Sequence, residues 1–485
     1  MIELVYLVFF VLAAFGAGSF VLNAARLRFS SPVEEFFFSV SMGYGIIALL
    51  TYLFGFFGLL YRQTYVLLFF ILLALSFTKI KLFSTNLLSF GKIRLKPDLF
   101  SALLCLIVFF ALFNLVASLA PPWSYDTTMY HLAVPKIYVG EHSFVALPSI
   151  LQSNWVMTPH MLFLAAFLLK NGILVNLVNF TFSIMLAAGI YSFGRRFFGK
   201  KIGVLAAAIF FTLPIVIVHS VSAHADLPLA FFAFSAFYAL VVWSRQDGNG
   251  VYHYPNTYPN RSIWWLVVSA FMTGLAASSK MTGLVLIPVM ILLLIFCELF
   301  AKKKYALSVL PSLLPKLVLF SLVVVAAAFP AYLKNIIYSG NPFFPLYYNI
   351  FGGKFLNAGI SEYFTAATNY GTGRSLVSFL FLPWNMTMHP LKFVDLLGIG
   401  PLFLAFVPLL LFVRRSWVAV LTLIAGLLCL VAWFLASQAL RYAIYVLPFF
   451  SILAAYVIFS LSARQDTSKY KFGYLIAAVL TVVFF

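Results

Sequence analysis

The sequence predicts an all-α polytopic membrane protein with about 13 or 14 transmembrane helices and two long outer loops that carry interfacial helices. Of its 485 residues, 64% are hydrophobic and only 9% are charged, whereas a soluble protein carries about a quarter charged residues. Apolar runs near the length that crosses about 30 Å of hydrocarbon recur along the whole chain. The composition therefore excludes a water-soluble globular protein.

The first apolar run, 2–25, is too long for a signal peptide and has no basic leader, so we expect it to be the first spanning helix. Further spans are expected at 36–60, 64–78, 99–120, 173–194, 202–220, 227–243, 263–279, 281–300, 317–333, 396–413, 416–435 and 443–462. A last run begins near Phe472 and stops at Phe485, about 14 residues later, so we expect a helix that continues past this sequence.

We expect three parts along the chain. Residues 1–98 hold about three spanning helices and a basic cytoplasmic linker. Residues 99–462 form a membrane core with outer loops at 121–172 and 334–395, and 463–485 begin a further helix. Interfacial helices are expected at 127–139 and 157–169, where aromatic and apolar residues alternate with polar ones.

The basic residues predict the orientation of the chain. Its 31 Lys and Arg against 12 Asp and Glu give a net charge of +19, which in a soluble protein would suggest a nucleic-acid partner. In a membrane protein the excess instead marks the cytoplasmic loops. If Arg26 and Arg28 are cytoplasmic, alternation of the spans gives every inner loop at least one Lys or Arg. We therefore expect no nucleic-acid partner.

Two acids and two bases, far apart in sequence, fall on the outer side in this threading. Asp126 follows the span 99–120, and Asp226 precedes the span 227–243. An ionisable residue at a membrane edge is by default a candidate functional residue. Lys280 lies between two apolar runs and Arg441 opens a late one.

Each of these residues also has a structural interpretation. Asp126 could be a solvated loop carboxylate or a helix cap, and Asp226 could cap the helix that follows it. Lys280 could snorkel to the bilayer surface, and Arg441 could anchor its helix at the interface. What favours a functional site is that all four are expected on one face.

The histidines and cysteines are possible metal ligands. Six of the seven histidines are expected outside: His131, His142, His160, His219, His224 and His389. His219, His224 and Asp226 are weak candidates for a metal, because their spacing matches no known zinc pattern. Cys105, Cys297 and Cys429 lie in apolar stretches and predict no disulfide. We assign no metal or other cofactor with certainty, and a divalent metal stays open.

This set of charges suits one chemistry at the membrane surface. Cations beside the hydrocarbon would bind a lipid phosphate and stabilise it as a leaving group. A carboxylate opposite them could deprotonate an acceptor hydroxyl or amine for attack on an anomeric carbon. One base suffices when the leaving group is a phosphate, in contrast to hydrolases that must protonate a departing sugar oxygen.

The chain resembles the glycosyltransferase C superfamily, closest to the branch of bacterial polytopic membrane enzymes that includes protein O-mannosyltransferases and the lipid A aminoarabinose transferase. The matching stretches, in the family's order between about 115 and 450, are SYDTTMYHLAVPK, RRFFGKKIGVLAAAIFFTLP, HADLPLAFFAFSAFYAL, GLAASSKMTGLVLIP, GNPFFP and LRYAIYVLP. Many members have two adjacent acids in the first loop, whereas here Thr127 follows Asp126.

The resemblance implies a membrane glycosyltransferase that takes a sugar from a polyprenyl-phosphate donor, with inversion, at the outer or periplasmic face of a bacterial inner membrane. The acceptor would be a cell-envelope glycan, a lipid or a protein. It implies the following roles: Asp126 as the general base, Asp226 as a second acidic position, Lys280 and Arg441 on the lipid phosphate, and Tyr130, His131, His224 and Tyr442 as flanking candidates.

Two other functions remain open from the sequence. A transporter or flippase of a polyprenyl-linked glycan is the alternative, although transporters usually place ionisable residues near the midplane or show repeat symmetry. A structural subunit without catalysis is the third.

Overall fold

A computed structural model describes residues 2–75, 99–244, 262–302, 306–366 and 370–462. Over these residues the chain forms helices and connecting loops, with no β-strand. The expected last helix after Phe472, most of the basic linker and His253 lie outside the described residues. The all-α fold class predicted from the sequence is confirmed.

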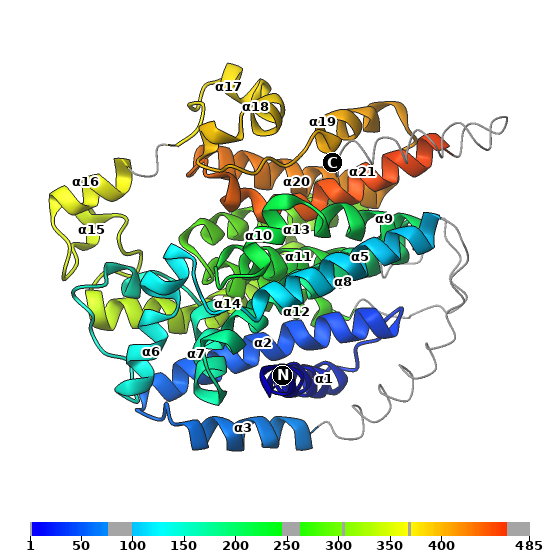
Figure 1. The fold of residues 1–485 in the computed structure, drawn as a ribbon. Coiled ribbons are helices and arrows are strands. Elements are labelled where there is room, and N and C mark those ends of the chain that lie inside the picture. Colours follow the sequence, from blue (N-terminus) through cyan, green and yellow to red (C-terminus); the bar gives the residue numbers. More distant parts are fainter. Residues whose placement is uncertain (1, 76–98, 245–261, 303–305, 367–369, 463–485) are drawn as a thin grey trace.

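The first three helices lie along one side of the bundle (Figure 1). They are α1 (Ile2–Ala24), α2 (Pro32–Phe56) and α3 (Arg62–Ala74). Ser31 caps α2 by accepting a hydrogen bond from the Glu34 backbone N–H, and Pro32 follows at the first helical position. α1 and α2 approach closely where Gly18 faces Ser39 and Gly43 faces Ala14, because a residue without Cβ lets two backbones meet.

The centre of the bundle is built around α8 (Gly172–Phe197), α11 (Asp226–Ser244) and α12 (Ile263–Ala277). Every residue of α11 except Ser244 is buried, which is the pattern of a helix surrounded by protein on all sides. Its aromatic residues pack on α2, on α8 and on α21 (Leu447–Ser462). Examples are Phe231 on Phe37 and Phe237 on Phe449.

Short helices follow α5 (Leu99–Ser118) in the first long loop. They are the η2 turn (Thr127–His131), α6 (Ala133–Gly140), η3 (Leu151–Asn154) and α7 (Pro159–Leu169). Both interfacial helices expected in this loop are thus present as helices, the first of them split between η2 and α6.

The remaining helices complete the bundle. Those beside the core are α5 (Leu99–Ser118), α9 (Lys200–Phe211), α10 (Pro214–Ser220), η4 (Met281–Val285), α13 (Leu286–Lys302), α14 (Ala306–Ser339), α20 (Trp417–Leu435), η7 (Leu440–Val446) and α21 (Leu447–Ser462). Short elements of the second long loop and its exit are α15 (Tyr348–Phe351), α16 (Ala358–Ala366), α17 (Leu376–Leu380), α18 (Leu382–Met388), η5 (Pro390–Phe393), α19 (Leu402–Phe406) and η6 (Val407–Phe412).

Nine helices in the described residues are long and apolar enough to cross a membrane, and a tenth span is formed if α9 and α10 count together across their 69° bend. The protein is therefore an integral membrane protein. Every other run predicted within these residues is also helical. Three of them, now 62–74, 263–277 and 402–412, are shorter than a full span, because hydropathy extends across turns where the helix itself ends.

The second long loop is expected from residue 334. In the structure its first residues are still helical, because α14 continues to Ser339. Lys334 interrupts the apolar run without interrupting the helix, and it is only 3% exposed. A single charged residue marks the end of an apolar run in the sequence. The helix ends only where its backbone leaves the helical conformation.

The close contact between α1 and α2 predicts a sensitive position. A Cβ at Gly43 would lie 1.8 Å from the Ala14 carbonyl oxygen, whereas nothing lies within 4 Å of one at Gly140. We expect Gly43→Leu to lower the stability of the purified protein by about 1–3 kcal/mol, as overpacking does, and Gly140→Leu to leave the packing intact. The melting temperature in detergent measures the stability of both variants. Equal melting temperatures for the two variants would contradict the assigned contact.

Candidate functional site

Asp126 and Arg441 form the first of two ion pairs at one end of the bundle, which we call the site end: here α5 and α12 finish and α11 and η7 begin. Arg441 Nη1 donates a hydrogen bond to Asp126 Oδ2 at 2.6 Å. The Asp126 side chain is 18% exposed and that of Arg441 is 29% exposed. A ligand can therefore reach this pair, which ties the first long loop to the last described span.

Asp226 and Lys280 form the second pair, deeper in the protein. Lys280 Nζ donates to Asp226 Oδ1 at 2.7 Å, and Asp226 is 3% exposed. Asp226 is the first residue of α11, where the helix dipole favours a carboxylate. Lys280 lies in the break between α12 and η4. Because its ammonium group turns inward to Asp226, the snorkelling alternative does not describe it.

The ring of Tyr442 joins the two pairs. Lys280 Nζ lies 3.5 Å from the ring centroid and Arg441 Cζ lies 5.3 Å from it. A cation held over an aromatic face is attracted by the ring quadrupole. Tyr442 therefore stabilises both cations at once and brings four charged residues from four separate chain segments into one cluster.

The loop between α10 and α11 is fixed by side-chain hydrogen bonds to its backbone. Asn179 Nδ2 donates to the carbonyl oxygens of His219 and Ser222 at 2.9 and 2.6 Å. Thr127 Oγ1 donates to the Ala223 carbonyl oxygen at 2.9 Å. The two acidic segments are thus held against each other by Thr127, the residue directly after Asp126.

Neutral histidines line the site behind the acids. His131 Nδ1 lies 2.6 Å from His160 Nε2, and His224 Nε2 lies 3.1 Å from Ser124 Oγ. The rings of His131 and His224 are 5.5 Å apart. Burial lowers the pKa of His224 to about 4, although the neighbouring Asp226 acts to raise it. Burial likewise lowers the pKa of His131 well below its usual range and that of His160 to about 3.

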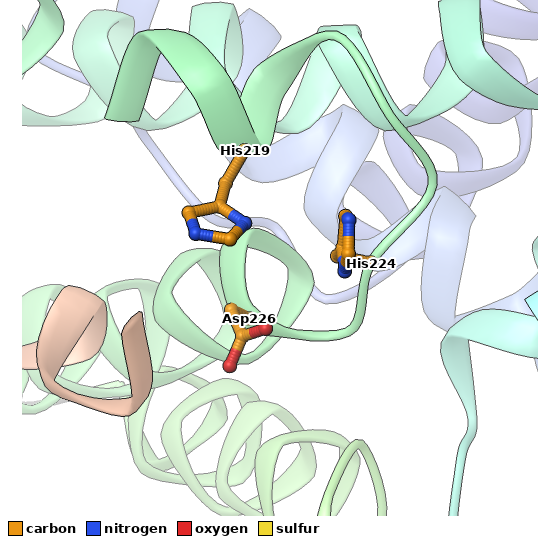
Figure 2. A group of neighbouring side chains, drawn as sticks. All are labelled: His219, His224 and Asp226. Carbon is orange, nitrogen blue, oxygen red and sulfur yellow. The ribbon is translucent and has the colours of Figure 1, made fainter. Parts of the chain in front are cut away.

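His219, His224 and Asp226 form a group that could hold a metal ion (Figure 2). His219 comes from α10, His224 from the loop and Asp226 from the start of α11, and one potential ligand atom of each lies within 4.8 Å of the others. Neutral imidazoles and a carboxylate are suitable ligands for a divalent ion. The Lys280 ammonium group already bonded to Asp226 disfavours a second cation there.

The structure brings together Asp126, Asp226, Lys280, Arg441, Tyr442, Tyr130, His131, His219 and His224, all singled out in the sequence. Tyr130 is buried, and its ring lies 4.3 Å from that of His131. Burial raises the pKa of Tyr130, and the nearby charge of Asp126 acts in the same direction. Two of the outer histidines do not join the site: His142 stacks on Tyr61 at 4.0 Å and His389 ends α18.

Ser124 and His160 belong to the site although neither is among the site residues predicted from the sequence. Ser124 lies two residues before Asp126, and this proximity in the sequence could have identified it as a site residue. His160 carries no such signal, because its contact with His131 spans 29 residues and two separate helices. Only the packing of α7 against α6 and η2 reveals it.

Comparison with known proteins places the chain in a family. The sequence matches the family described as "Domain of unknown function (DUF8201)" over residues 1–448, so the chain belongs to that family. No curated protein sequence matches it.

The fold is similar to that of ArnT from Cupriavidus metallidurans. The structure of ArnT bound to undecaprenyl phosphate matches with a TM-score of 0.51 and 17% identity, over 78% of this chain and 63% of the ArnT chain. Its apo structure matches over 62% of the ArnT chain with the same score and identity. This chain thus spans less than two thirds of the length of ArnT. At this identity the likeness is one of the fold alone, and it agrees with the fold expected from the sequence.

A weaker likeness is found to the archaeal oligosaccharyltransferase AglB from Archaeoglobus fulgidus. The TM-score is 0.47 with 16% identity, over 79% of this chain and 54% of AglB. At that score it supports no conclusion about this chain.

The Asp226–Lys280 pair predicts a non-additive effect on stability. Lys280→Met leaves a carboxylate buried without its counter-charge, so we expect a loss of about 3–5 kcal/mol in the free energy of unfolding. The double variant Asp226→Asn/Lys280→Met should recover most of that loss. Denaturation of the purified protein in detergent measures the free energy of unfolding of each variant. Lys392→Met, at an exposed position, is the control. Equal losses in the single and double variants would contradict the pairing.

The buried histidines predict a stability that falls in acid. Their folded pKa lies below the unfolded value of about 6.5, so the unfolded state binds more protons between those two values. For His160 the loss starts near pH 6.5 and ends near its folded pKa of about 3, at up to about 1.4 kcal/mol per pH unit. We expect the melting temperature to fall less steeply from pH 7 to pH 4 in His160→Gln than in the wild type. Parallel curves would contradict a neutral His160.

Proposed function

We propose that this member of the DUF8201 family is a membrane glycosyltransferase that moves a sugar from a polyprenyl-phosphate donor to an acceptor at the outer face of the membrane. The observation that carries the proposal is the charged cluster at the site end, in which Asp126–Arg441 and Asp226–Lys280 meet at Tyr442. The fold supports it, because ArnT, which has a similar fold, binds undecaprenyl phosphate.

In the proposed reaction Asp126 is the general base. Arg441 occupies Oδ2, and no described residue forms a hydrogen bond to Oδ1, so Oδ1 is free to accept the proton of an acceptor hydroxyl or amine. The deprotonated oxygen or nitrogen attacks the anomeric carbon, and the bond from that carbon to the phosphate oxygen breaks. The electron pair leaves with the lipid phosphate, and attack opposite the leaving group inverts the sugar.

Cations stabilise the leaving group in this scheme. Lys280 and Arg441 lie within one cluster, and each retains donor groups beyond the one used for its acid. A phosphate that approaches the cluster would receive hydrogen bonds from both. Asp226 keeps Lys280 in place, and the neutral His131 and His224 behind it can donate or accept without adding charge.

The proposed reaction requires no metal. His219, His224 and Asp226 are the residues that would hold a divalent ion, which would supply Lewis-acid stabilisation of the phosphate. In their place the Lys280 ammonium group provides positive charge beside Asp226. No second acid follows Asp126, because the next residue is Thr127, whose hydroxyl donates a hydrogen bond to the Ala223 carbonyl oxygen. This is consistent with a site in which Lys and Arg side chains, and not a metal ion, bind the phosphate.

Outer-face action follows from the orientation proposed for the chain. The Lys and Arg residues concentrate in loops that alternate with those carrying Asp126 and Asp226. In bacteria the site would then face the periplasm, and its products would belong to the cell envelope.

The proposal predicts that Asp126→Asn abolishes transfer. The asparagine keeps the shape of the side chain but cannot accept the proton, so we expect product to fall by about 10²- to 10⁴-fold. Cells lacking the gene would be complemented with wild type, Asp126→Asn or the control Glu141→Gln, which changes an exposed acid of the same loop. Mass spectrometry of lipid-linked and envelope glycans measures donor and product.

Two results would contradict the assignment. Wild-type product with Asp126→Asn would remove Asp126 as the base. Movement of a lipid-linked glycan across liposome membranes by the wild-type protein, with no transferred product, would favour the transporter instead. Equal expression and melting temperature of the three proteins show that a loss of product is not a loss of fold.

A further inference from the structure

Lys334 is a buried cation that the proposed reaction has not used. It lies in the last two turns of α14 and is 3% exposed. Its Nζ donates to the Ser153 carbonyl oxygen at 2.6 Å, and no ion pair within the described part of the chain joins it to a carboxylate. An ammonium group has three donors, and a buried charge without a counter-charge is unfavourable. Lys334 is therefore suited to receive an anion.

The chain segment that Lys334 contacts carries further polar atoms without partners. Ser153 Oγ, Asn154 Nδ2 and Trp155 Nε1 are buried, and none forms a hydrogen bond within the described residues. Asn154 is itself 2% exposed. Buried polar groups are nearly always paired, so each unpaired one requires an explanation. Three consecutive residues with unpaired polar atoms, beside an unpaired cation, indicate a place built for a polar ligand.

This segment is continuous with the site end. The Trp155 ring lies 5.4 Å from that of Tyr130, which neighbours Asp126. Thr158 donates from its backbone N–H and from Oγ1 to the carbonyl oxygen and Oγ of Ser278, both at 2.8 Å. Ser278 lies two residues before Lys280. The segment that Lys334 contacts is therefore linked to Tyr130, which follows Asp126 in the chain, and to Ser278, which precedes Lys280.

The charge balance of the cluster shows why a third cation matters. Asp126 and Asp226 carry two negative charges, and Arg441 and Lys280 carry two positive ones. The cluster is thus neutral before any ligand arrives. A lipid phosphate brings at least one negative charge, and Lys334 is a buried lysine that no ion pair within the described residues joins to a carboxylate.

We propose that Lys334, Asn154 and Trp155 form an anion-binding site that holds the phosphate of the lipid-linked donor. The Lys334 ammonium group supplies the charge, and the Asn154 and Trp155 N–H groups supply direction. This inference rests on the proposed function and deepens it. Lys280 and Arg441 still donate hydrogen bonds to the phosphate, but their charges are balanced by the two acids, so Lys334 adds the positive charge that gives the site its net affinity for phosphate.

The test is a binding titration of the purified full-length protein in detergent with undecaprenyl phosphate, with undecaprenol and inorganic phosphate in parallel. We expect the wild type to bind undecaprenyl phosphate and neither of the other two with similar affinity. Lys334→Met should raise Kd about tenfold or more, as expected for loss of a charged hydrogen bond. Trp155→Phe, which removes only the N–H, should raise it less. Lys392→Met removes a lysine charge from an exposed position and should leave Kd unchanged.

The opposite results overturn the proposal. Wild-type Kd in Lys334→Met, with a lower melting temperature of the free protein, would make Lys334 a structural link between α14 and η3. Equal binding of inorganic phosphate would assign the site to a free oxyanion. If Lys334→Met does not fold, Trp155→Phe and Asn154→Ala decide, because both leave the Lys334–Ser153 contact in place. If the wild type binds the lipid but transfers no sugar, the proposed function fails while this site stands.

Discussion

A charge buried in an apolar bundle needs an opposite charge, and the site end of this protein is organised by that constraint. Asp226 is 3% exposed at the start of α11, a helix surrounded by protein. Removing such a carboxylate from water without a partner costs several kcal/mol. Lys280 meets that need from the break between α12 and η4, so the two helices are fixed relative to each other. Asp126 and Arg441 repeat the arrangement nearer the surface.

The positions of the four charges explain why the cluster can be both rigid and accessible. None lies in the middle of a helix; each lies at a helix end or in the segment that precedes one. Helix ends have backbone groups free to bind side chains, and Thr127 and Asn179 use such groups to fix the loop around His224. The four charged side chains are therefore held at helix ends, and Asp126 and Arg441 keep part of their surface exposed.

Much of the fold follows from hydropathy alone, because lipid permits only helices that satisfy their own backbone. Each apolar run expected within the described residues is a helix. Helix ends were less predictable: α14 passes through Lys334, and the run 263–279 ends as a 15-residue helix. Hydropathy reports the polarity of the side chains, whereas the end of a helix is set by the backbone conformation, so hydropathy locates helix ends less well. For the candidate site, alternation of the spans placed Asp126, Asp226, Lys280 and Arg441 on one face without placing any of them in contact.

Hydropathy and charge are enough to predict that the protein spans a membrane, that it is helical, and that a few charges gather at one side. The packing of the helices sets which acid meets which base, brings Tyr442 against both cations, and brings His160 to His131. It also showed that Lys334, expected in a loop, is buried in a helix beside Ser153. The difference lies in the range of the interactions. Burial in lipid acts on each segment separately, so the composition of that segment predicts it. An ion pair joins side chains up to 315 residues apart, and whether they meet depends on the packing of every helix between them.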